Sequence, residues 1–161
     1  MTLAPDDRVG FHVKRVEQEL IALKTLVLKP SGLTVPQYSA LVMISLNPGA
    51  TAAALARFNM VTPQTMATIL TNLADKGLVE RKPDPYHLNS ISVELTDYGK
   101  QILATADQAA VSVERTLGAA FTDEERETLI SLLARCSDTL HAQAAEHDGG
   151  NAAMRPYRGS N

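Results

Sequence analysis

The sequence has one cysteine, no tryptophan, three phenylalanines and four tyrosines among its 161 residues. A single thiol excludes an internal disulfide framework and is typical of a reducing cytoplasm. The shortage of aromatic rings argues against binding of single-stranded nucleic acid by base stacking. No apolar run approaches the ~20 residues of a membrane span, and the N-terminus lacks a signal-peptide pattern. We therefore expect a cytoplasmic protein with no membrane partner.

Signatures of catalysis and of metal binding are also missing. The sequence contains no glycine-rich phosphate loop, no GxSxG motif and no His–carboxylate spacing of the metalloprotease type. His141 and His147 do not share a helix face, and no cysteine or paired carboxylate completes a zinc site with recognisable spacing. The sequence predicts a protein that is not an enzyme and that binds no metal or cofactor.

A helix-turn-helix pattern occupies residues 51–82. Thr51 and Thr62 stand where side-chain oxygens cap helices, and Pro63 is tolerated in the first turn of the second helix. Gly77 ends that helix because glycine readily adopts the left-handed conformation. Helical spacing of apolar residues predicts a buried face of Met66, Ile69, Leu70 and Leu73.

The opposite face of this second helix carries short, uncharged polar side chains. Gln and Asn can bond adenine bidentately, and Thr can bond base edges or touch the thymine methyl group. The same face is equally compatible with an ordinary solvated surface, since every amphipathic helix has one. As contacts to double-stranded DNA we predict Thr62 on a phosphate and, on base edges, Gln64, Thr65, Thr68 and Asn72.

A short hairpin is predicted after the second helix. Residues 78–82 form one strand candidate, and residues 91–95 alternate apolar and polar side chains as a half-buried strand does. A helix-turn-helix followed by a small hairpin is a winged helix. The predicted fold class is therefore mainly α with a small β-hairpin wing (α+β), and residues 33–96 form its winged helix-turn-helix domain.

The charge balance is unfavourable for a DNA-binding chain. The net charge is −3, and the basic and acidic side chains of residues 51–95 cancel. Because affinity for DNA depends largely on neutralised phosphates, the few cations must be concentrated on one side. Arg81 and Lys82, beside the wing, are the candidates for phosphate contacts.

Long helices with apolar stripes flank this module. Residues 8–28 repeat Val and Leu at a three-to-four spacing. Thr34 and Gln37 form a capping box at the start of the following helix. Thr96 caps a later helix, whose apolar seam we predict to consist of Tyr98, Ile102, Ala106, Ala109, Val113 and Leu117.

The last helix begins at a second capping box, and one of its faces carries Leu129, Leu132, Leu133, Cys136 and Leu140. These stripes exceed what a winged helix needs for its own core, so a second copy of the chain would bury them in a two-fold homodimer. We predict that residues 1–32 and 97–145 form a helical dimerisation domain and that residues 146–161 form a flexible tail. Such a dimer requires a pseudo-palindromic operator.

Three segments resemble the MarR family of bacterial transcriptional regulators, namely residues 62–81, 90–99 and 121–133. The resemblance covers nearly the whole chain apart from the tail. It implies a homodimer whose paired winged helices bind operator DNA. Many members are released from DNA by a small phenolic or aromatic acid bound between the two domains. We therefore expect a dimeric transcriptional repressor with a small aromatic effector.

The wing departs from the family pattern, in which an Asp is followed two places later by an Arg that enters the minor groove. His87 and Asn89 hold those places here. Asn89 cannot supply the cation that a narrow minor groove attracts, which leaves Arg81, Lys82 and His87 to hold the wing on DNA. This departure and the neutral segment motivate an alternative, a winged-helix protein-interaction module that has lost DNA binding.

The resemblance places the effector site where the first helix, the Tyr38 helix and the second helix of the helix-turn-helix meet. An aromatic acid needs a cation and a hydroxyl group beside apolar walls. Each candidate is also explained by core packing or surface charge. The candidates are His12, Arg15, Tyr38, Met43, Met66 and Arg81.

Cys136 lies on the apolar stripe of the last helix. Peroxide-sensing members of the family place their cysteine in the first helix, and reactive thiols need exposure and a lowered pKa. We interpret Cys136 as a buried structural thiol rather than a redox sensor.

Overall fold

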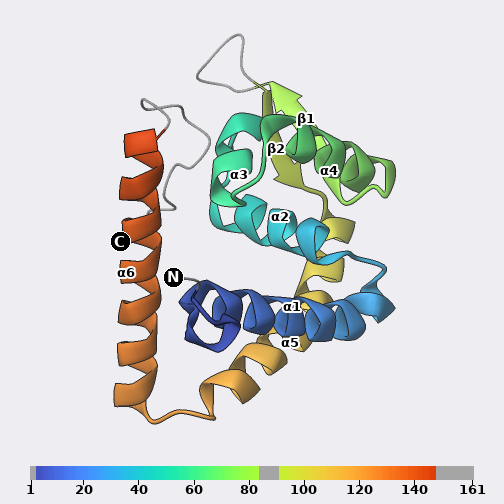
Figure 1. Cartoon of the computed structure of the whole chain (residues 1–161). Coiled ribbons are helices and arrows are strands. Elements are labelled where there is room, and N and C mark those ends of the chain that lie inside the picture. The colour runs from blue at the N-terminus through green and yellow to red at the C-terminus, as the bar shows by residue number, and fades with distance from the viewer. Residues whose placement is uncertain (1–2, 84–90, 148–161) are drawn as a thin grey trace.

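The computed structural model describes residues 3–83 and 91–147 (Figure 1). Its elements in chain order are η1 (Pro5–Asp7), α1 (Val9–Leu28), η2 (Lys29–Ser31), α2 (Val35–Leu46), α3 (Ala52–Phe58), α4 (Pro63–Asp75), β1 (Val79–Pro83), β2 (Ile91–Leu95), α5 (Asp97–Gly118) and α6 (Asp123–His147). In Figure 1, α2, α3, α4 and the hairpin lie together above α1 and α5, and α6 stands to one side. The fold is mainly α with a small antiparallel hairpin, as the sequence predicts.

Threonine hydroxyls cap five of the described helices, and each of these caps was predicted. Thr51, Thr62 and Thr96 each accept a hydrogen bond from the backbone N–H three residues later. Thr34 and Thr122 form full capping boxes, in which the glutamine or glutamate at the third helical position bonds back to the backbone N–H of the threonine. Local chemistry thus fixes where these helices begin.

The core lies where α4 packs against α2 and α3. Met66, Leu70 and Leu73 on the inner face of α4 are fully buried, and Ile69 nearly so, which confirms the predicted stripe. Their neighbours in the same cluster include Leu28, Leu41, Leu55 and Val93. Burying each such side chain stabilises the fold by about 1.5–3 kcal/mol. This packing holds one side of α4 inward and leaves the opposite side exposed.

The hairpin is joined to both ends of the helix-turn-helix. β1 and β2 pair antiparallel, with Arg81 opposite Val93. Gly77 adopts φ +68°, so it ends α4 in the left-handed conformation and turns the chain into β1. At the other end, the backbone N–H of Val93 donates to the carbonyl of Ala50, just before α3. The hairpin, α3 and α4 therefore form one packed module.

The buried face of α5 shares Ala106 and Val113 with the predicted seam but otherwise differs from it. Tyr98 and Leu117 are 56% and 40% exposed, so they do not belong to the core. The face that packs inward comprises Gly99, Leu103, Ala106, Ala110 and Val113. Gly99 explains the shift, because a Cβ atom there would lie 1.9 Å from the carbonyl oxygen of Leu78. Only glycine lets α5 approach the start of β1 this closely.

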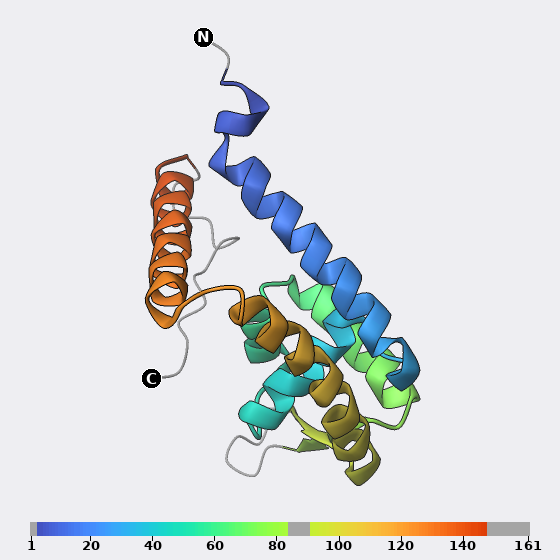
Figure 2. The same cartoon turned by 90° about the horizontal axis from the view of Figure 1, so that it is seen from below.

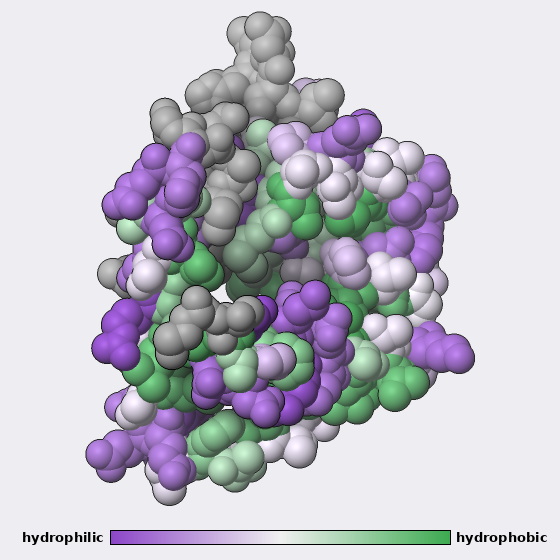
Figure 3. All heavy atoms as spheres, viewed as in Figure 1, coloured by the Kyte–Doolittle hydropathy of each residue, from purple (hydrophilic) through white to green (hydrophobic). Residues whose placement is uncertain are grey.

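The last helix buries no residue within its own chain. The predicted stripe of α6 is exposed, with Leu133 46% and Leu140 56% accessible, and Cys136 is half-buried rather than buried. In α1 only Leu28 is buried, and Figure 2 shows the N-terminal half of this helix projecting away from the winged module. Figure 3 shows apolar side chains along α6 and along the lower edge of the molecule. Within the described ranges, no helix has the length and apolar character needed to cross a membrane.

Candidate nucleic-acid interface

The exposed side of α4 brings the predicted base-contacting residues together. Gln64, Thr65, Thr68 and Asn72 all lie on the solvent side of this helix, opposite the buried stripe. Thr62 precedes them at the N-cap and is also exposed. The arrangement presents an uncharged polar surface concentrated in the first three turns of α4.

Bonds at the other end of α4 fix its orientation. The Nζ atom of Lys76 donates to the carbonyl of Gly32 at 2.8 Å and to Oε1 of Gln37 at 3.0 Å. The hydroxyl of Thr96 donates to the carbonyl of Gly77 at 2.7 Å. Because these bonds connect the end of α4 to the start of α2 and to α5, the outer face of α4 cannot turn freely about the helix axis.

The wing strand carries fewer available cations than the sequence suggests. Lys82 Nζ lies 2.8 Å from a carboxylate oxygen of Glu80 and 2.7 Å from one of Glu94. Hydrogen bonds to these two carboxylates raise the pKa of Lys82 above its usual range. Lys82 therefore already has anionic partners where we predicted a phosphate contact. Arg81 is exposed on β1, and His87 and Asn89 lie outside the described residues.

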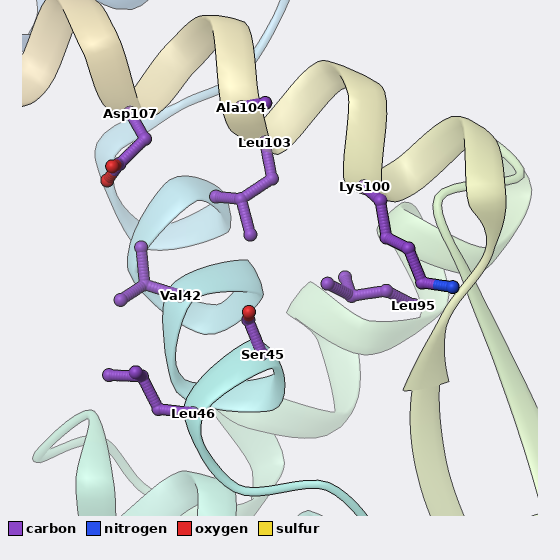
Figure 4. Close-up of a pocket in the computed structure, with 8 residues that line it drawn as sticks. All are labelled: Val42, Ser45, Leu46, Leu95, Lys100, Leu103, Ala104 and Asp107. Carbon is purple, nitrogen blue, oxygen red and sulfur yellow. The ribbon is translucent and has the colours of Figure 1, made fainter.

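A cavity of about 330 Å³ lies between α2, β2 and α5. Figure 4 shows Lys100 and Asp107 near opposite ends of its α5 wall, with Leu103 and Ala104 between them. Lys100 also donates to Asp97 at 2.9 Å. The complete lining is Val42, Ser45, Leu46, Leu95, Lys100, Leu103, Ala104 and Asp107. The cavity therefore offers apolar walls with a few polar groups, the composition typical of small-molecule sites.

The six predicted effector-site residues do not gather around this cavity. His12 and Arg15 are exposed on α1, and the ring of His12 bonds to the carbonyl of Asp6. Met66, on the inner face of α4, is fully buried in the hydrophobic core, and Arg81 is exposed on the wing strand. Met43 and Tyr38 are half-buried on α2.

Tyr38 reaches the cavity through Asp107. Its phenolic oxygen donates a 2.7 Å hydrogen bond to Oδ1 of Asp107, one of the lining residues. Burial and this neighbouring carboxylate raise the pKa of the Tyr38 phenol above its usual range. Sequence reasoning missed Lys100 and Asp107, because single polar residues on an amphipathic helix carry no signal of a shared cavity. Within the described ranges, no cluster of three metal-ligating side chains occurs.

Comparison with known proteins agrees with this architecture. The MarR family model matches residues 31–87. The HTH-type transcriptional repressor Rv2887 of Mycobacterium tuberculosis is 34% identical over 128 residues, which cover 79% of this chain and 92% of that protein. The chain belongs to the MarR family.

Two solved MarR-type structures resemble the chain. The structure of Rv2887 in complex with salicylic acid has a TM-score of 0.64 and 31% identity, covering 83% of this chain and 99% of that one. The repressor CouR bound to a 23-mer DNA duplex has a TM-score of 0.75 and 25% identity, covering 85% and 99%. CouR has also been solved with p-coumaroyl-CoA. These MarR-type proteins share the winged helix described above.

Proposed function

We propose that the protein is a cytoplasmic, dimeric repressor that binds a pseudo-palindromic operator in double-stranded DNA and is released by a small aromatic effector. The observation that carries this proposal is the exposed, uncharged face of α4, held opposite the core in a fold shared with DNA-bound CouR. In such modules the second helix of the helix-turn-helix enters the major groove. The base contacts are Gln64, Thr65, Thr68 and Asn72.

Phosphate contacts hold the module on the duplex. Thr62 at the N-cap of α4 and Arg81 on β1 are both exposed and supply one hydroxyl and one cation. Lys82 can contact a phosphate only if its ion pairs with Glu80 and Glu94 are replaced by bonds to phosphate oxygens. His87 belongs to the same set through the sequence pattern of the wing. With so few cations per chain, pairing of two chains doubles the electrostatic attraction to DNA.

The dimer is supported by apolar surface that one chain leaves exposed. Val9, Phe11, Val13 and Val16 of α1 are each more than two-fifths exposed, as are three leucines of α6. Residues 1–32 and 97–145 supply these surfaces, and residues 33–96 supply the DNA-binding module. A two-fold axis then sets the two α4 helices about 34 Å apart, one turn of DNA.

The effector is an aromatic acid that enters the cavity between α2, β2 and α5. Lys100 offers a cation to its carboxylate, Ser45 offers a hydroxyl group, and leucines form the walls. The effector can release DNA only if the dimer has a second state, in which the two α4 helices are spaced differently and no longer fit the operator. The effector must then bind that second state more tightly than the DNA-binding state. Salicylic acid bound to Rv2887 is the model for its chemistry.

Fluorescence anisotropy with the DNA upstream of the protein's own gene tests the proposal. We expect binding that weakens steeply between ~50 mM and ~200 mM salt. The double variant Gln64→Ala, Thr68→Ala should bind at least about tenfold more weakly, since a good bidentate pair to a base contributes about 1–3 kcal/mol and Thr68 adds a smaller contact. The matched control is Thr105→Ala, Gln108→Ala, which truncates the same residue types on the exposed side of α5.

The second candidate function is a protein-interaction module without DNA binding. It is favoured by the pairing of Lys82 with two carboxylates, which removes a cation from the wing. Absence of binding to any duplex at ~50 mM salt and micromolar protein would select this function and reject the repressor.

A further inference from the structure

One exposed row on α4 begins with a glutamine and continues with side chains that present methyl groups rather than hydrogen-bond donors. Gln64, Ala67, Thr68 and Thr71 recur at a helical spacing and are all exposed. The hydroxyl of Thr68 donates to the carbonyl of Gln64 at 3.2 Å, and the hydroxyl of Thr71 donates to the carbonyl of Ala67 at 2.9 Å. Both threonines thus use their only hydroxyl hydrogen inside the helix.

This bonding decides what the row offers to a partner. A hydroxyl whose hydrogen is engaged retains acceptor lone pairs and cannot donate outward. Beside each oxygen, Thr68 and Thr71 carry a methyl group, and Ala67 adds a third. The middle of α4 therefore presents three methyl groups and two acceptors.

The same helix lacks the side chains that recognise guanine. Guanine presents two acceptors in the major groove, which arginine or lysine usually satisfies. The segment Pro63–Asp75 contains neither residue type. Lys76, just beyond it, donates to Gly32 and Gln37. A G·C pair below the middle of α4 would leave guanine acceptors facing methyl groups.

We propose that Ala67, Thr68 and Thr71 contact thymine methyl groups, so that each operator half-site has A·T pairs at the positions that face the middle of α4. An A·T pair presents a thymine methyl group and an adenine N6 donor in the major groove. The methyl group packs on the methyl groups of the row, and the donor meets a threonine oxygen. Gln64, at the start of the row, bonds the edge of an adjacent adenine. This inference rests on the proposed DNA-binding function.

The first experiment selects the preferred site with the full-length chain. A pool of random duplexes of about 30 base pairs, enough for two half-sites, is bound at ~50 mM salt and sequenced after several rounds. We expect two inverted half-sites with A·T pairs at their centres. Each thymine of the selected duplex is then replaced singly by uracil, which removes one methyl group and keeps the base pairing.

Uracil should weaken binding about fourfold at two or three positions in each half-site, the effect of losing one buried methyl group. Uracil outside the half-sites is the control and should leave the affinity unchanged.

Two variants of Thr68 test which side chain contacts the methyl group. Thr68→Ser keeps the hydroxyl and loses the methyl group, so it should bind the thymine duplex about fourfold more weakly and no longer distinguish uracil at one position. Thr68→Val keeps a methyl group and should still make that distinction.

The outcomes separate the inference from the function on which it rests. Selected sites with G·C centres, or equal affinity for thymine and uracil at every position, would overturn the methyl readout while DNA binding stands. Failure to select any duplex would overturn the proposed function and the inference with it.

Discussion

The phenolic oxygen of Tyr38 donates a 2.7 Å hydrogen bond to Asp107 and so connects α2 to α5 at the edge of the cavity. Removing the hydroxyl in Tyr38→Phe should lower the free energy of unfolding by about 1–2 kcal/mol, since the acceptor is a carboxylate. Urea denaturation measures this change. Tyr98→Phe removes the same atom from an exposed site on α5 and should stay within about 0.5 kcal/mol of the wild type.

The same pair predicts how stability depends on pH. Burial and Asp107 raise the pKa of Tyr38 in the folded chain above its value of about 10 in the unfolded chain. The contribution of Tyr38 to stability is therefore complete below about pH 10 and is lost as the pH rises further, because the unfolded chain ionises first. The stability difference between the wild type and Tyr38→Phe should stay constant from about pH 7 to 9 and shrink by about pH 11. A difference that grows with pH would contradict this assignment.

Releasing Lys82 from its carboxylates should strengthen DNA binding. In the double variant Glu80→Gln, Glu94→Gln the ammonium group loses both ion-pair partners and two negative charges leave the wing. We expect tighter binding and a slope of log K against log salt that is steeper by about one unit per chain, because one more cation meets a phosphate. Glu124→Gln, Glu127→Gln removes the same charge from α6 and should leave the slope unchanged. An unaltered slope in the wing variant would mean that Lys82 makes no contact with a DNA phosphate.

Gly99 should not tolerate alanine. The added Cβ atom would lie 1.9 Å from the carbonyl oxygen of Leu78, so α5 or β1 must shift. We expect a loss of about 3 kcal/mol in the free energy of unfolding, measured by urea denaturation. Gly10→Ala in α1 meets nothing within 4 Å and should be neutral or stabilising by up to about 1 kcal/mol. Equal effects of the two substitutions would argue against the close contact.

A charge on the apolar stripe of α6 should separate the proposed dimer. Leu133 is 46% exposed in one chain, and in the dimer it would pack against the partner. In Leu133→Lys we expect a dissociation constant raised by at least about 100-fold, measured by analytical ultracentrifugation, because an unpaired ammonium group would be buried. Ser131→Lys places the same charge near the opposite side of α6 and should leave the association unchanged. A wild-type chain that sediments as a monomer would refute the dimer itself.

Local chemistry explains which parts of the fold were predictable. The threonine caps and the turn at Gly77 depend on residues within three or four positions, so the sequence alone determines them. The buried stripe of α4 was equally clear because its apolar residues are flanked by polar ones. The MarR resemblance then assembled these pieces into a winged helix.

Longer-range relationships were not predictable. On α5 the pairs Ile102/Leu103 and Ala109/Ala110 support two stripes one residue apart, and the contact of Gly99 with Leu78 decides between them. Tyr38 and Asp107 are 69 positions apart, and no periodicity connects them. Lys82 forms an ion pair with Glu94 across the hairpin, and this pairing depends on the register of the two strands. In each case a tertiary contact overrides the expectation drawn from one segment.

The contact at Gly99 has a mechanical consequence. It packs the first turn of α5 against Leu78, just before β1, so we expect the helix and the winged module to move together as one rigid unit. The 22 residues of α5 span roughly 33 Å. A pivot of about 5° near Gly118 would then displace the far end by about 3 Å, comparable to the rise of one base-pair step. In the proposed dimer, a slight tilt of this unit would therefore be enough to move the two α4 helices out of phase with the helical repeat of DNA.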